Sequence, residues 1–232
     1  MPNSAILWHS SYLLEYDKSV KKPDKQGSKS KKDTFTISAD SGHVADLAAG
    51  RHGDPFSVLG RHVVDGEEVF RCFQPRTLNL WLEDEKRPMK RLPGTDLFEC
   101  RARPGEIPEN YRVIRETDYG ISFTRYDPYS FWPQLDLGAM AAFNYGEHRY
   151  AQDVLGARRH SVNGIHGTLF SVGAPNAGRV SVIGEFNEWH GRNHPMPNQA
   201  HQRIWELFVP DIMERRYRYQ NRNPDTGQLL IN

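Results

Sequence analysis

Short segments that alternate apolar and polar residues, separated by turn residues, dominate the chain after residue 60. In the first part of this region such segments predict five strands: VFRCFQP (69–75), LNLWLED (78–84), LFECRAR (97–103), NYRVIRET (110–117) and GISFTRY (120–126). In the second segment Leu78, Leu80 and Leu82 stand at every second position, as expected of a strand with one buried face. Pro93-Gly94 and Pro104-Gly105 mark turns between the segments.

A second series of similar segments follows residue 160. Its predicted strands are TLFSVGAP (168–175), RVSVIGEF (179–186), IWELFVP (204–210), RYRYQNRN (216–223) and QLLIN (228–232). The two series share an aromatic-Glu pair, a proline and a Tyr-Arg pair, and in both the proline lies seven residues before the tyrosine. In the first series these residues are Phe98-Glu99, Pro104 and Tyr111-Arg112. In the second they are Trp205-Glu206, Pro210 and Tyr217-Arg218. This internal repeat of roughly one hundred residues predicts an all-β chain of two tandem β-sandwiches.

The repeat runs out at the C-terminal end of the second copy. In the first copy Asp127-Pro128-Tyr129 follows Tyr111 by sixteen residues, and the equivalent place falls just beyond Asn232. We therefore expect the second sandwich to be incomplete, lacking its final strand or its exit segment. An unpaired sheet edge would remain.

The periodicity changes between the two series. Apolar residues within 150–155 recur at spacings of three and four, and Gly156 follows, which predicts a short helix between Gly146 and Gly156. The expected organisation is a disordered tail (1–40), a first sandwich (41–135), a helical connector (136–160) and a second sandwich (161–232).

Residues 17–34, DKSVKKPDKQGSKSKKDT, form a lysine-rich stretch almost without apolar residues. Such a segment cannot bury enough surface to offset the entropy of ordering, so it is expected to be a disordered linker. A basic arm for nucleic acid is the alternative, but three aspartates dilute its charge. The whole chain carries a net charge of +1, which gives no basic footprint for nucleic acid.

Cysteine content and the N-terminal sequence predict a cytoplasmic protein. Cys72 and Cys100 both lie in strand-like segments and are interpreted as reduced, buried thiols. The first residues lack a basic region followed by an apolar run, so no signal peptide is indicated. No apolar run approaches the ~18 residues that cross a bilayer, so no membrane partner is expected.

The chain contains no strong catalytic or cofactor motif. Phosphate-binding, dinucleotide-binding, zinc-protease and serine-hydrolase signatures are all missing from the sequence. His190 and His194 are four residues apart, but Gly191 and Pro195 oppose the helix that would place them on one face, so no metal site is expected. We therefore predict no catalytic residue, no metal and no cofactor in this chain.

One loop places a tryptophan where exposure is expected. In VIGEFNEWHGR (182–192) the strand ends at Gly184, which permits a close approach, and Phe186 is expected to pack inward. Asn187 can hold the turn through its own side chain. Trp189 then remains as a flat apolar surface that suits the C–H face of a glucose ring, although capping of the core is an alternative.

Polar residues near this tryptophan could complete a sugar site. Asn187, Arg192 and Arg218 are candidate hydrogen-bond donors to sugar hydroxyls. Trp205 is the opposite case, since it alternates with Leu207 and Val209 and is expected in the core.

Several segments resemble the N-terminal region of bacterial glycogen (1,4-alpha-glucan) branching enzymes. They are DPFSVLGRH (54–62), YDPYSFWPQLD (126–136), SVNGIHGTLFSVGAPNAGRVSVIGEFNEWHGRNHPM (161–196) and IWELFVP (204–210). The resemblance implies two immunoglobulin-like modules, of which the second binds glucan, followed in the family by a (β/α)₈ catalytic barrel. It also implies that Trp189 stacks on glucan and that Arg218 contacts sugar, whereas the family's second stacking tryptophan has no counterpart.

A barrel needs about 250 residues, and none follow the second module in this sequence. The resemblance therefore implies a non-catalytic portion of a branching enzyme that binds α-1,4-glucan (glycogen or maltooligosaccharide) weakly. The alternative is a docking fragment that packs against a separate catalytic barrel without useful sugar affinity. An enzyme in its own right and a nucleic-acid-binding protein are two further hypotheses, and the former would require branching activity from this chain alone.

Overall fold

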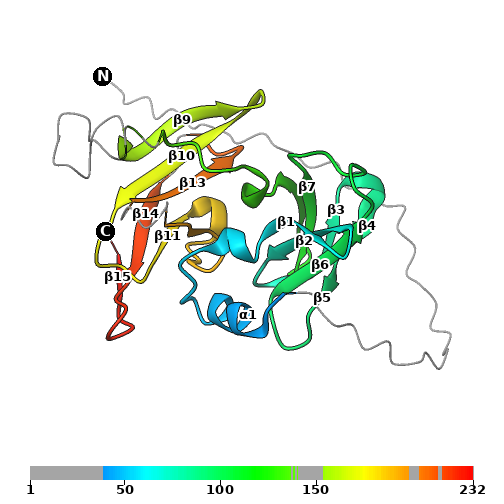
Figure 1. Cartoon of the computed structure of the whole chain (residues 1–232), viewed down its shortest axis with the longest axis horizontal. Helices are drawn as coiled ribbons and strands as arrows, with labels where there is room; N and C mark the ends of the chain where they lie inside the picture. The colour runs from blue at the N-terminus through cyan, green and yellow to red at the C-terminus, as the bar shows by residue number, and fades with distance from the viewer. Residues whose placement is uncertain are drawn as a thin grey trace, which may run out of the picture. The chain divides into compact units, whose positions relative to one another are not determined.

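A computed structural model describes most of the chain, and two pairs of antiparallel sheets account for its architecture (Figure 1). The described residues are 39–136, 138, 140, 154–198, 204–213 and 216–231. The predicted lysine-rich tail and nearly all of the predicted helix before Gly156 lie outside them. Both pairs of sheets belong to one compact unit, Phe35–Asn232.

The first pair of sheets contains all five strands predicted between residues 69 and 126, and three more. One sheet has the order β1 (Gly60–Val64), β2 (Glu67–Phe73), β6 (Leu97–Ala102) and β5 (Lys90–Arg91). The other has the order β4 (Arg87–Pro88), β3 (Thr77–Leu82), β7 (Arg112–Thr117) and β8 (Ser122–Tyr126). Short helical turns, η2 (Asp84–Lys86) and η3 (Pro128–Ser130), follow β3 and β8.

The second pair repeats this arrangement. One sheet has the order β13 (Ile204–Pro210), β10 (Ile165–Gly173) and β9 (Gly156–Val162). The other has the order β12 (Pro195–Met196), β11 (Arg179–Gly184), β14 (Tyr217–Arg222) and β15 (Leu229–Ile231), and the turn η5 (Glu185–Asn187) follows β11.

The strand orders confirm the internal repeat and correct two expectations. β9, β10 and β13 pair as β1, β2 and β6 do, and β12-β11-β14-β15 matches β4-β3-β7-β8. Of the two alternatives expected for the end of the second sandwich, a missing final strand is wrong, because β15 pairs with Gln220–Arg222 of β14 in the place of β8, and a missing exit segment stays a prediction. Residues 156–160, assigned to a helical connector, instead form most of β9, whose pairing with β10 overrides the weak local pattern.

The expected alternation in β3 fails at its first leucine. Leu80 and Leu82 are buried, but Leu78 is 58% exposed. The pairing of β3 with β7 shifts register between Thr77 and Asn79. This bulge turns Thr77 inward and Leu78 outward, a change that the alternation of residue types alone does not reveal.

A helix that the pattern did not predict precedes the first sandwich. Helix α1 (Ser41–Ala48) begins after Asp40, whose carboxylate accepts hydrogen bonds from the backbone N–H groups of Gly42 and His43. Its residues Val44 and Leu47 are buried. With only two buried residues on a single face, its apolar period is too short to identify from sequence.

The sandwiches have separate and shared apolar cores. The first sandwich encloses a cluster around Phe70, Phe98 and Tyr111. A larger cluster contains residues of α1 and of both sandwiches. They are Val44 and Leu47 of α1, Phe73, Leu97 and Tyr129 of the first sandwich, and Phe170, Val182 and Trp205 among those of the second.

The core position predicted for Trp205 is confirmed, since it is 1% exposed and its indole N–H donates to the Ala174 carbonyl at 3.0 Å.

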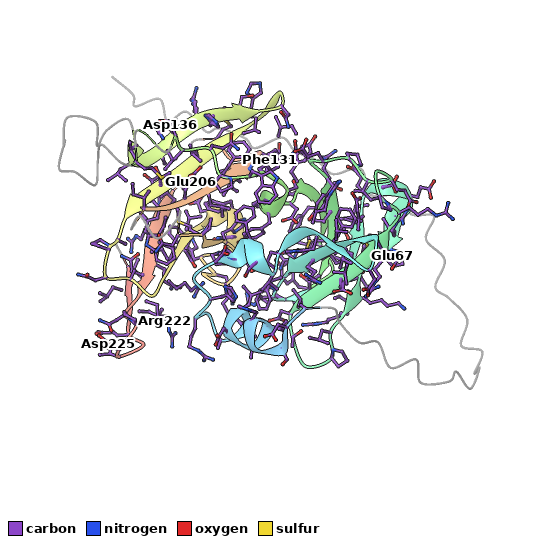
Figure 2. All side chains as sticks on the ribbon, in the orientation of Figure 1. Glu67, Phe131, Asp136, Glu206, Arg222 and Asp225 are labelled. Atoms are coloured by element: carbon purple, nitrogen blue, oxygen red, sulfur yellow. The ribbon has the colours of Figure 1, made fainter. Side chains whose placement is uncertain are left out.

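A buried glutamate occupies the same position in both copies but has different partners. In the first copy Glu99 lies opposite Arg71, which donates to it at 2.9 Å, and both side chains are buried. In the second copy Ser171 stands opposite Glu206. Glu206, labelled in Figure 2, instead accepts the backbone N–H groups of residues 134 and 135, the latter at 3.0 Å. Burial raises the pKa of Glu206. With a serine at the position that has an arginine in the first copy, this carboxylate instead holds the segment between the sandwiches.

A buried carboxylate also closes the first sandwich. Asp127 accepts the Tyr111 hydroxyl at 2.5 Å and the Cys72 thiol at 3.4 Å, while its other oxygen accepts the Tyr129 backbone N–H at 3.1 Å. Burial raises the pKa of Asp127, of Tyr111 and of Cys72. Both Cys72 and Cys100 are free and buried, as predicted. This network fixes the end of β8 against the start of β7.

Tyr111→Phe should lower the free energy of unfolding by about 1–3 kcal/mol, because a buried acceptor on Asp127 then loses its shortest hydrogen bond. Urea denaturation followed by circular dichroism measures this loss. Tyr217→Phe is the matched control in the repeat, since Tyr217 is 38% exposed. Equal losses from both substitutions would show that the hydroxyl of Tyr111 adds nothing specific.

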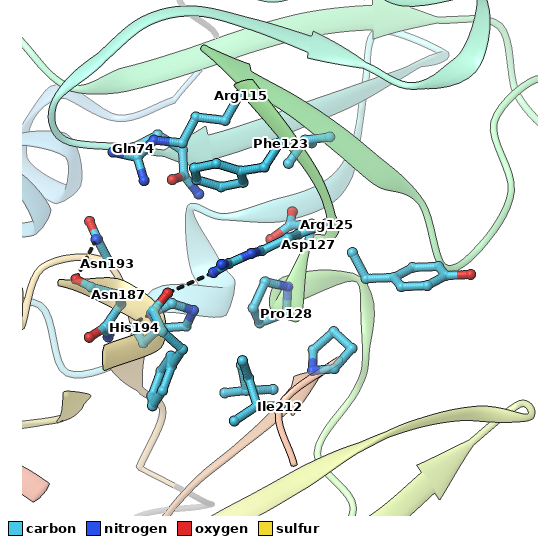
Figure 3. A pocket seen from close by; sticks show the side chains of 15 residues that line it. Gln74, Arg115, Phe123, Arg125, Asp127, Pro128, Asn187, Asn193, His194 and Ile212 are labelled. Carbon is cyan, nitrogen blue, oxygen red and sulfur yellow. Dashed lines mark hydrogen bonds between the residues drawn. The ribbon is translucent and has the colours of Figure 1, made fainter. Parts of the chain in front are cut away.

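A small cavity between the sandwiches is lined by a neutral histidine (Figure 3). The cavity has a volume of about 50 Å³, and His194 lines it together with Arg115, Arg125 and Asn187. The Asn187 amide donates to Nδ1 of His194 at 2.8 Å, so this nitrogen is unprotonated. Burial, with smaller contributions from Arg125 and Arg115, lowers the pKa of His194 to about 3. Its neutral form is thus the one that the folded chain requires.

Stability should fall as the pH falls below about 6.5, because the unfolded chain then binds a proton on His194 that the folded chain excludes until about pH 3. We expect this residue to account for about 2 kcal/mol of loss between pH 7 and 4.5. His194→Gln keeps an acceptor but cannot titrate, so its free energy of unfolding should depend less steeply on pH.

His166→Gln, at an exposed position of β10, is the control. Urea titrations of both variants at four pH values give the slopes. A slope for His194→Gln equal to that of the wild type would show that His194 is not the group responsible.

Candidate functional site

The loop after β11 carries the tryptophan singled out from the sequence. It begins where Gly184 packs closely against its neighbours: a Cβ atom there would lie 2.5 Å from the Arg216 carbonyl oxygen and 2.6 Å from the Phe186 ring. The inward position predicted for Phe186 is confirmed, since it is 5% exposed and stacks near Phe170 at 5.9 Å between ring centroids. The strand therefore ends at a point that only glycine fits.

Asn187 holds this loop from the inside. Its side-chain oxygen accepts the Gly184 N–H at 2.9 Å, and its amide donates to the Val182 carbonyl at 2.9 Å and to His194. The predicted turn-holding role is thus confirmed. With 3% exposure and its amide engaged, Asn187 does not fit the other role expected of it, that of a donor to a sugar.

Trp189 lies at the outermost part of the loop. It is 42% exposed, and both Glu188 and Trp189 have a left-handed backbone with φ of 57°. The Trp189 backbone N–H donates to the Gly184 carbonyl at 2.9 Å, which folds the chain back over the end of β11. The expected exposure is confirmed, and a role in sugar binding stays a prediction.

A buried arginine anchors the far end of the loop. Arg179 of β11 is 4% exposed and donates to the carbonyls of Gly191 and Gly50 and to the Ser181 hydroxyl, the last at 2.5 Å. Burial lowers its pKa to about 10. Gly191 also lies against Gln220 of β14, where a Cβ atom would clash with the amide oxygen. The loop thus lies over the outer face of the β12-β11-β14-β15 sheet.

Arg218 lies on this same face. It is exposed, and it precedes Gln220 by two residues on β14, so both side chains point to the side that the loop covers. Its register partner is Ile183, one residue before the glycine that begins the loop. The register thus places Arg218 beside the end of β11 from which the loop with Trp189 starts, and a site shared by the two side chains stays a prediction.

Arg192 has a different environment from the one expected. Its guanidinium donates to the Ala48 carbonyl at 3.2 Å, lies 3.7 Å from the Asp96 carboxylate and faces the Phe73 ring. These partners belong to α1 and the first sandwich. Arg192 thus joins the loop to the rest of the chain, and the role predicted for it as a donor to a sugar stays a prediction.

Two exposed aromatic residues were not identified from the sequence. Tyr217 is 38% exposed beside the start of the loop, opposite Gly184 in the strand register, and contacts Phe170 edge-on. Trp132 is 67% exposed and stacks on Phe56 at 5.9 Å. The Tyr-Arg pair marked Tyr217 only as part of the repeat, and Trp132 lies in a segment without periodicity.

The repeat allows a comparison for the loop after β11 that carries Trp189, here called the tryptophan loop. In the first copy the loop after β3 also contains two successive left-handed residues, Glu85 with φ of 48° and Lys86 with φ of 52°. The two pairs do not occupy matching positions, since Lys86 directly precedes β4, whereas Trp189 lies six residues before β12. A left-handed pair thus occurs in this loop of both copies, and only the second copy has a tryptophan in it.

The described residues contain no cluster of three or more potential metal ligands and no helix long and apolar enough to cross a membrane. His190 and His194, the spaced pair noted in the sequence, face different surroundings: His194 lines the cavity, and His190 lies near Arg192.

Comparisons with known proteins divide the chain between two families. Residues 40–129 match the model of the alpha-1,4-glucan branching enzyme GlgB N-terminal domain, and residues 154–231 match carbohydrate-binding module 48, the isoamylase N-terminal domain. Among curated relatives, 1,4-alpha-glucan branching enzyme GlgB of Methylococcus capsulatus is 38% identical over 86% of this chain, and that of Cellvibrio japonicus is 38% identical over 78%.

The chain spans about a quarter of the length of these relatives, 27% and 26% respectively. Among solved structures, a pullulanase from Anoxybacillus sp. LM18-11 shares 20% identity over 73% of this chain and 24% of its own, but the TM-score of 0.27 supports no argument. The two family models and the curated relatives agree with the order of the two sandwiches. The chain therefore belongs to the N-terminal region of the bacterial glycogen branching enzymes, with a GlgB N-terminal domain followed by a family 48 carbohydrate-binding module.

Proposed function

We propose that this chain binds α-1,4-glucan through the outer end of its second sandwich and thereby serves glycogen branching, the activity in its relatives' name. The observation that carries the proposal is the exposed Trp189 on a fixed loop, which starts beside Arg218 in a module of a carbohydrate-binding family. No residue of this chain is proposed to be catalytic.

The chemistry of the two side chains suits a glucose ring. The indole of Trp189 offers a flat apolar surface for the C–H face of the sugar, and burying that face releases water. Arg218 offers guanidinium N–H groups to ring hydroxyls. The left-handed pair of the first sandwich, Glu85 and Lys86, contains no aromatic residue, and no sugar site is proposed there.

Docking onto a catalytic domain is a second candidate function, and one observation favours it. Edge strand β15 exposes Leu229, Leu230 and Ile231, each between 47% and 52%. Exposed apolar residues on an edge strand suit burial against another protein surface. This role is compatible with glucan binding, because β15 pairs with the far end of β14 at Gln220–Arg222.

Trp189→Ala should abolish most of the retardation of this chain by glycogen in a native gel. With one stacked ring and a few hydrogen bonds, we expect a wild-type Kd between about 10 μM and 1 mM, and a loss of at least about tenfold in the variant. Trp132→Ala is the matched control, since it removes another exposed indole outside this loop.

Free migration of the wild-type chain at all glycogen concentrations would contradict glucan binding and favour the docking role. Equal retardation of wild type and Trp189→Ala would place the sugar site elsewhere. The same gels with Arg218→Gln test the second residue, for which a smaller loss of about two- to fivefold is expected.

A further inference from the structure

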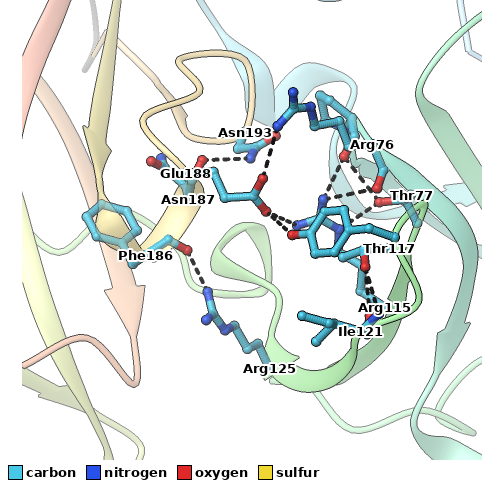
Figure 4. A network of polar contacts seen from close by, with 12 residues as sticks. Arg76, Thr77, Arg115, Thr117, Ile121, Arg125, Phe186, Asn187, Glu188 and Asn193 are labelled. Atoms are coloured by element: carbon cyan, nitrogen blue, oxygen red, sulfur yellow. Dashed lines mark hydrogen bonds and ion pairs between the residues drawn. The ribbon is translucent and has the colours of Figure 1, made fainter.

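The middle of the tryptophan loop is held by the first sandwich (Figure 4). The carboxylate of Glu188 accepts the Tyr119 hydroxyl at 2.9 Å and lies 3.4 Å from Arg76 and 3.8 Å from Arg115. Tyr119 and Arg76 come from the β7–β8 and β2–β3 turns, and Arg115 from β7 itself. Three side chains from separate parts of the first sandwich thus contact one carboxylate of the second sandwich.

We propose that this contact, the Glu188 clamp formed by Glu188, Arg76, Arg115 and Tyr119, positions Trp189 for glucan. The proposal rests on the proposed function of Trp189. It assigns to the first sandwich a role in binding that requires no sugar contact of its own.

The groups of the clamp are themselves held in place. Arg115 is 6% exposed, and it donates to the Thr77 hydroxyl at 2.7 Å and to the Pro75 carbonyl at 2.8 Å. The turn that bears Tyr119 is closed by Thr117, whose hydroxyl donates to the Ile121 carbonyl and accepts the Ile121 N–H, both at 3.0 Å. Glu188 is therefore received by a fixed Arg115 and a fixed turn, and ordering these two costs little entropy.

A second contact lies beside the clamp. Arg125 of β8 donates to the Phe186 carbonyl at 2.6 Å, two residues before Glu188. The loop thus receives donors from β7, β8 and two turns of the first sandwich, and its motion relative to that sandwich is restricted on both sides of Asn187.

The loop needs this support at its middle because its ends are already fixed by other means. Asn187 holds the start through Gly184, and Arg179 holds the end through Gly191. Between them Glu188 and Trp189 adopt the left-handed conformation, which costs about 1 kcal/mol for a residue other than glycine. A strained, exposed segment loses its order first unless a contact opposes the loss.

The first copy of the repeat shows which part of this arrangement is additional. Glu85 and Lys86 adopt the same left-handed conformation, so the clamp is not needed to create it. Glu85 is exposed, and within the described part of the chain it has no ion pair or hydrogen bond through its carboxylate. The clamp accompanies only the copy with the tryptophan, as expected if it serves to immobilise the indole before the ligand arrives.

The test compares Glu188→Gln with Glu85→Gln in the full chain. Both remove one charge from the first of two left-handed residues, but only Glu188→Gln weakens the clamp. Glycogen affinity from native gels should fall about three- to tenfold in Glu188→Gln and stay unchanged in Glu85→Gln. Tyr119→Phe should weaken binding about two- to threefold, and combining it with Glu188→Gln should add less than the sum of the two effects.

A second measurement reports on position without sugar. This measurement is the quenching of Trp189 fluorescence by acrylamide. The contribution of Trp189 is obtained by subtracting the fluorescence of the same protein with Trp189→Phe. Quenching should increase in Glu188→Gln and Tyr119→Phe and stay at the wild-type level in Glu85→Gln, with thermal unfolding confirming that all variants fold.

Unchanged affinity and quenching in Glu188→Gln would overturn the clamp. Two other outcomes would also overturn the clamp, since Glu188 would then act on the sugar directly. One is weaker binding with unchanged quenching. The other is that the effects of Glu188→Gln and Tyr119→Phe simply add. If the wild-type chain binds no glycogen, the proposed function fails, and the quenching measurement still decides whether the clamp positions Trp189.

Discussion

The shared apolar core between the two sandwiches is the constraint on which the rest of the structure depends. Phe73, Leu97 and Tyr129 of the first sandwich lie in the same buried cluster as Trp205 of the second, and α1 adds two more residues to it. Because close-packed interiors resist sliding, this cluster fixes where the turns of the first sandwich meet the loop of the second. The polar contacts on Glu188 and Phe186 can form only after that packing has placed their donors.

The two copies of the repeat keep their backbone and differ in their buried polar groups. Glu99 has an arginine opposite it, whereas Glu206 has Ser171 and accepts backbone N–H groups of the connecting segment instead. Tyr111 is buried against Asp127, whereas its counterpart Tyr217 is partly exposed. In each pair the group of the second copy lacks the internal partner found in the first: Glu206 contacts the connecting segment, and Tyr217 is exposed.

The sequence was most informative where burial decided the pattern. Every strand predicted from alternation was present, and Trp205 and Phe186 are buried as expected, because apolar residues at period two have one stable arrangement in a sandwich. Strands β1 and β9 were not predicted, since both are largely half-buried edge strands with many polar residues, and their pairing partners rather than their own pattern determine them.

The candidate site was predictable only in part, for a related reason. The exposure of Trp189 followed from a strand that ends at a glycine, which is local information. The engagement of Arg192 with α1 and Asp96 depends on groups about one hundred residues away or more, and a single sequence gives no sign of such partners. The three groups around Glu188 lie about 70 to 110 residues away in the sequence, so the clamp could not be anticipated from the loop itself.

Immobilising one indole suits a weak site on a polymeric ligand. A single stacked ring provides little binding free energy, so any entropy lost in ordering the loop would consume much of it. A loop that is already ordered retains that free energy for the sugar. On a glucan, the same glucose unit recurs along each chain, and a rigid site of low affinity can rebind neighbouring units without reorganisation. Contacts between the sandwiches would then determine how well the second one binds, although the first contributes no side chain to the sugar.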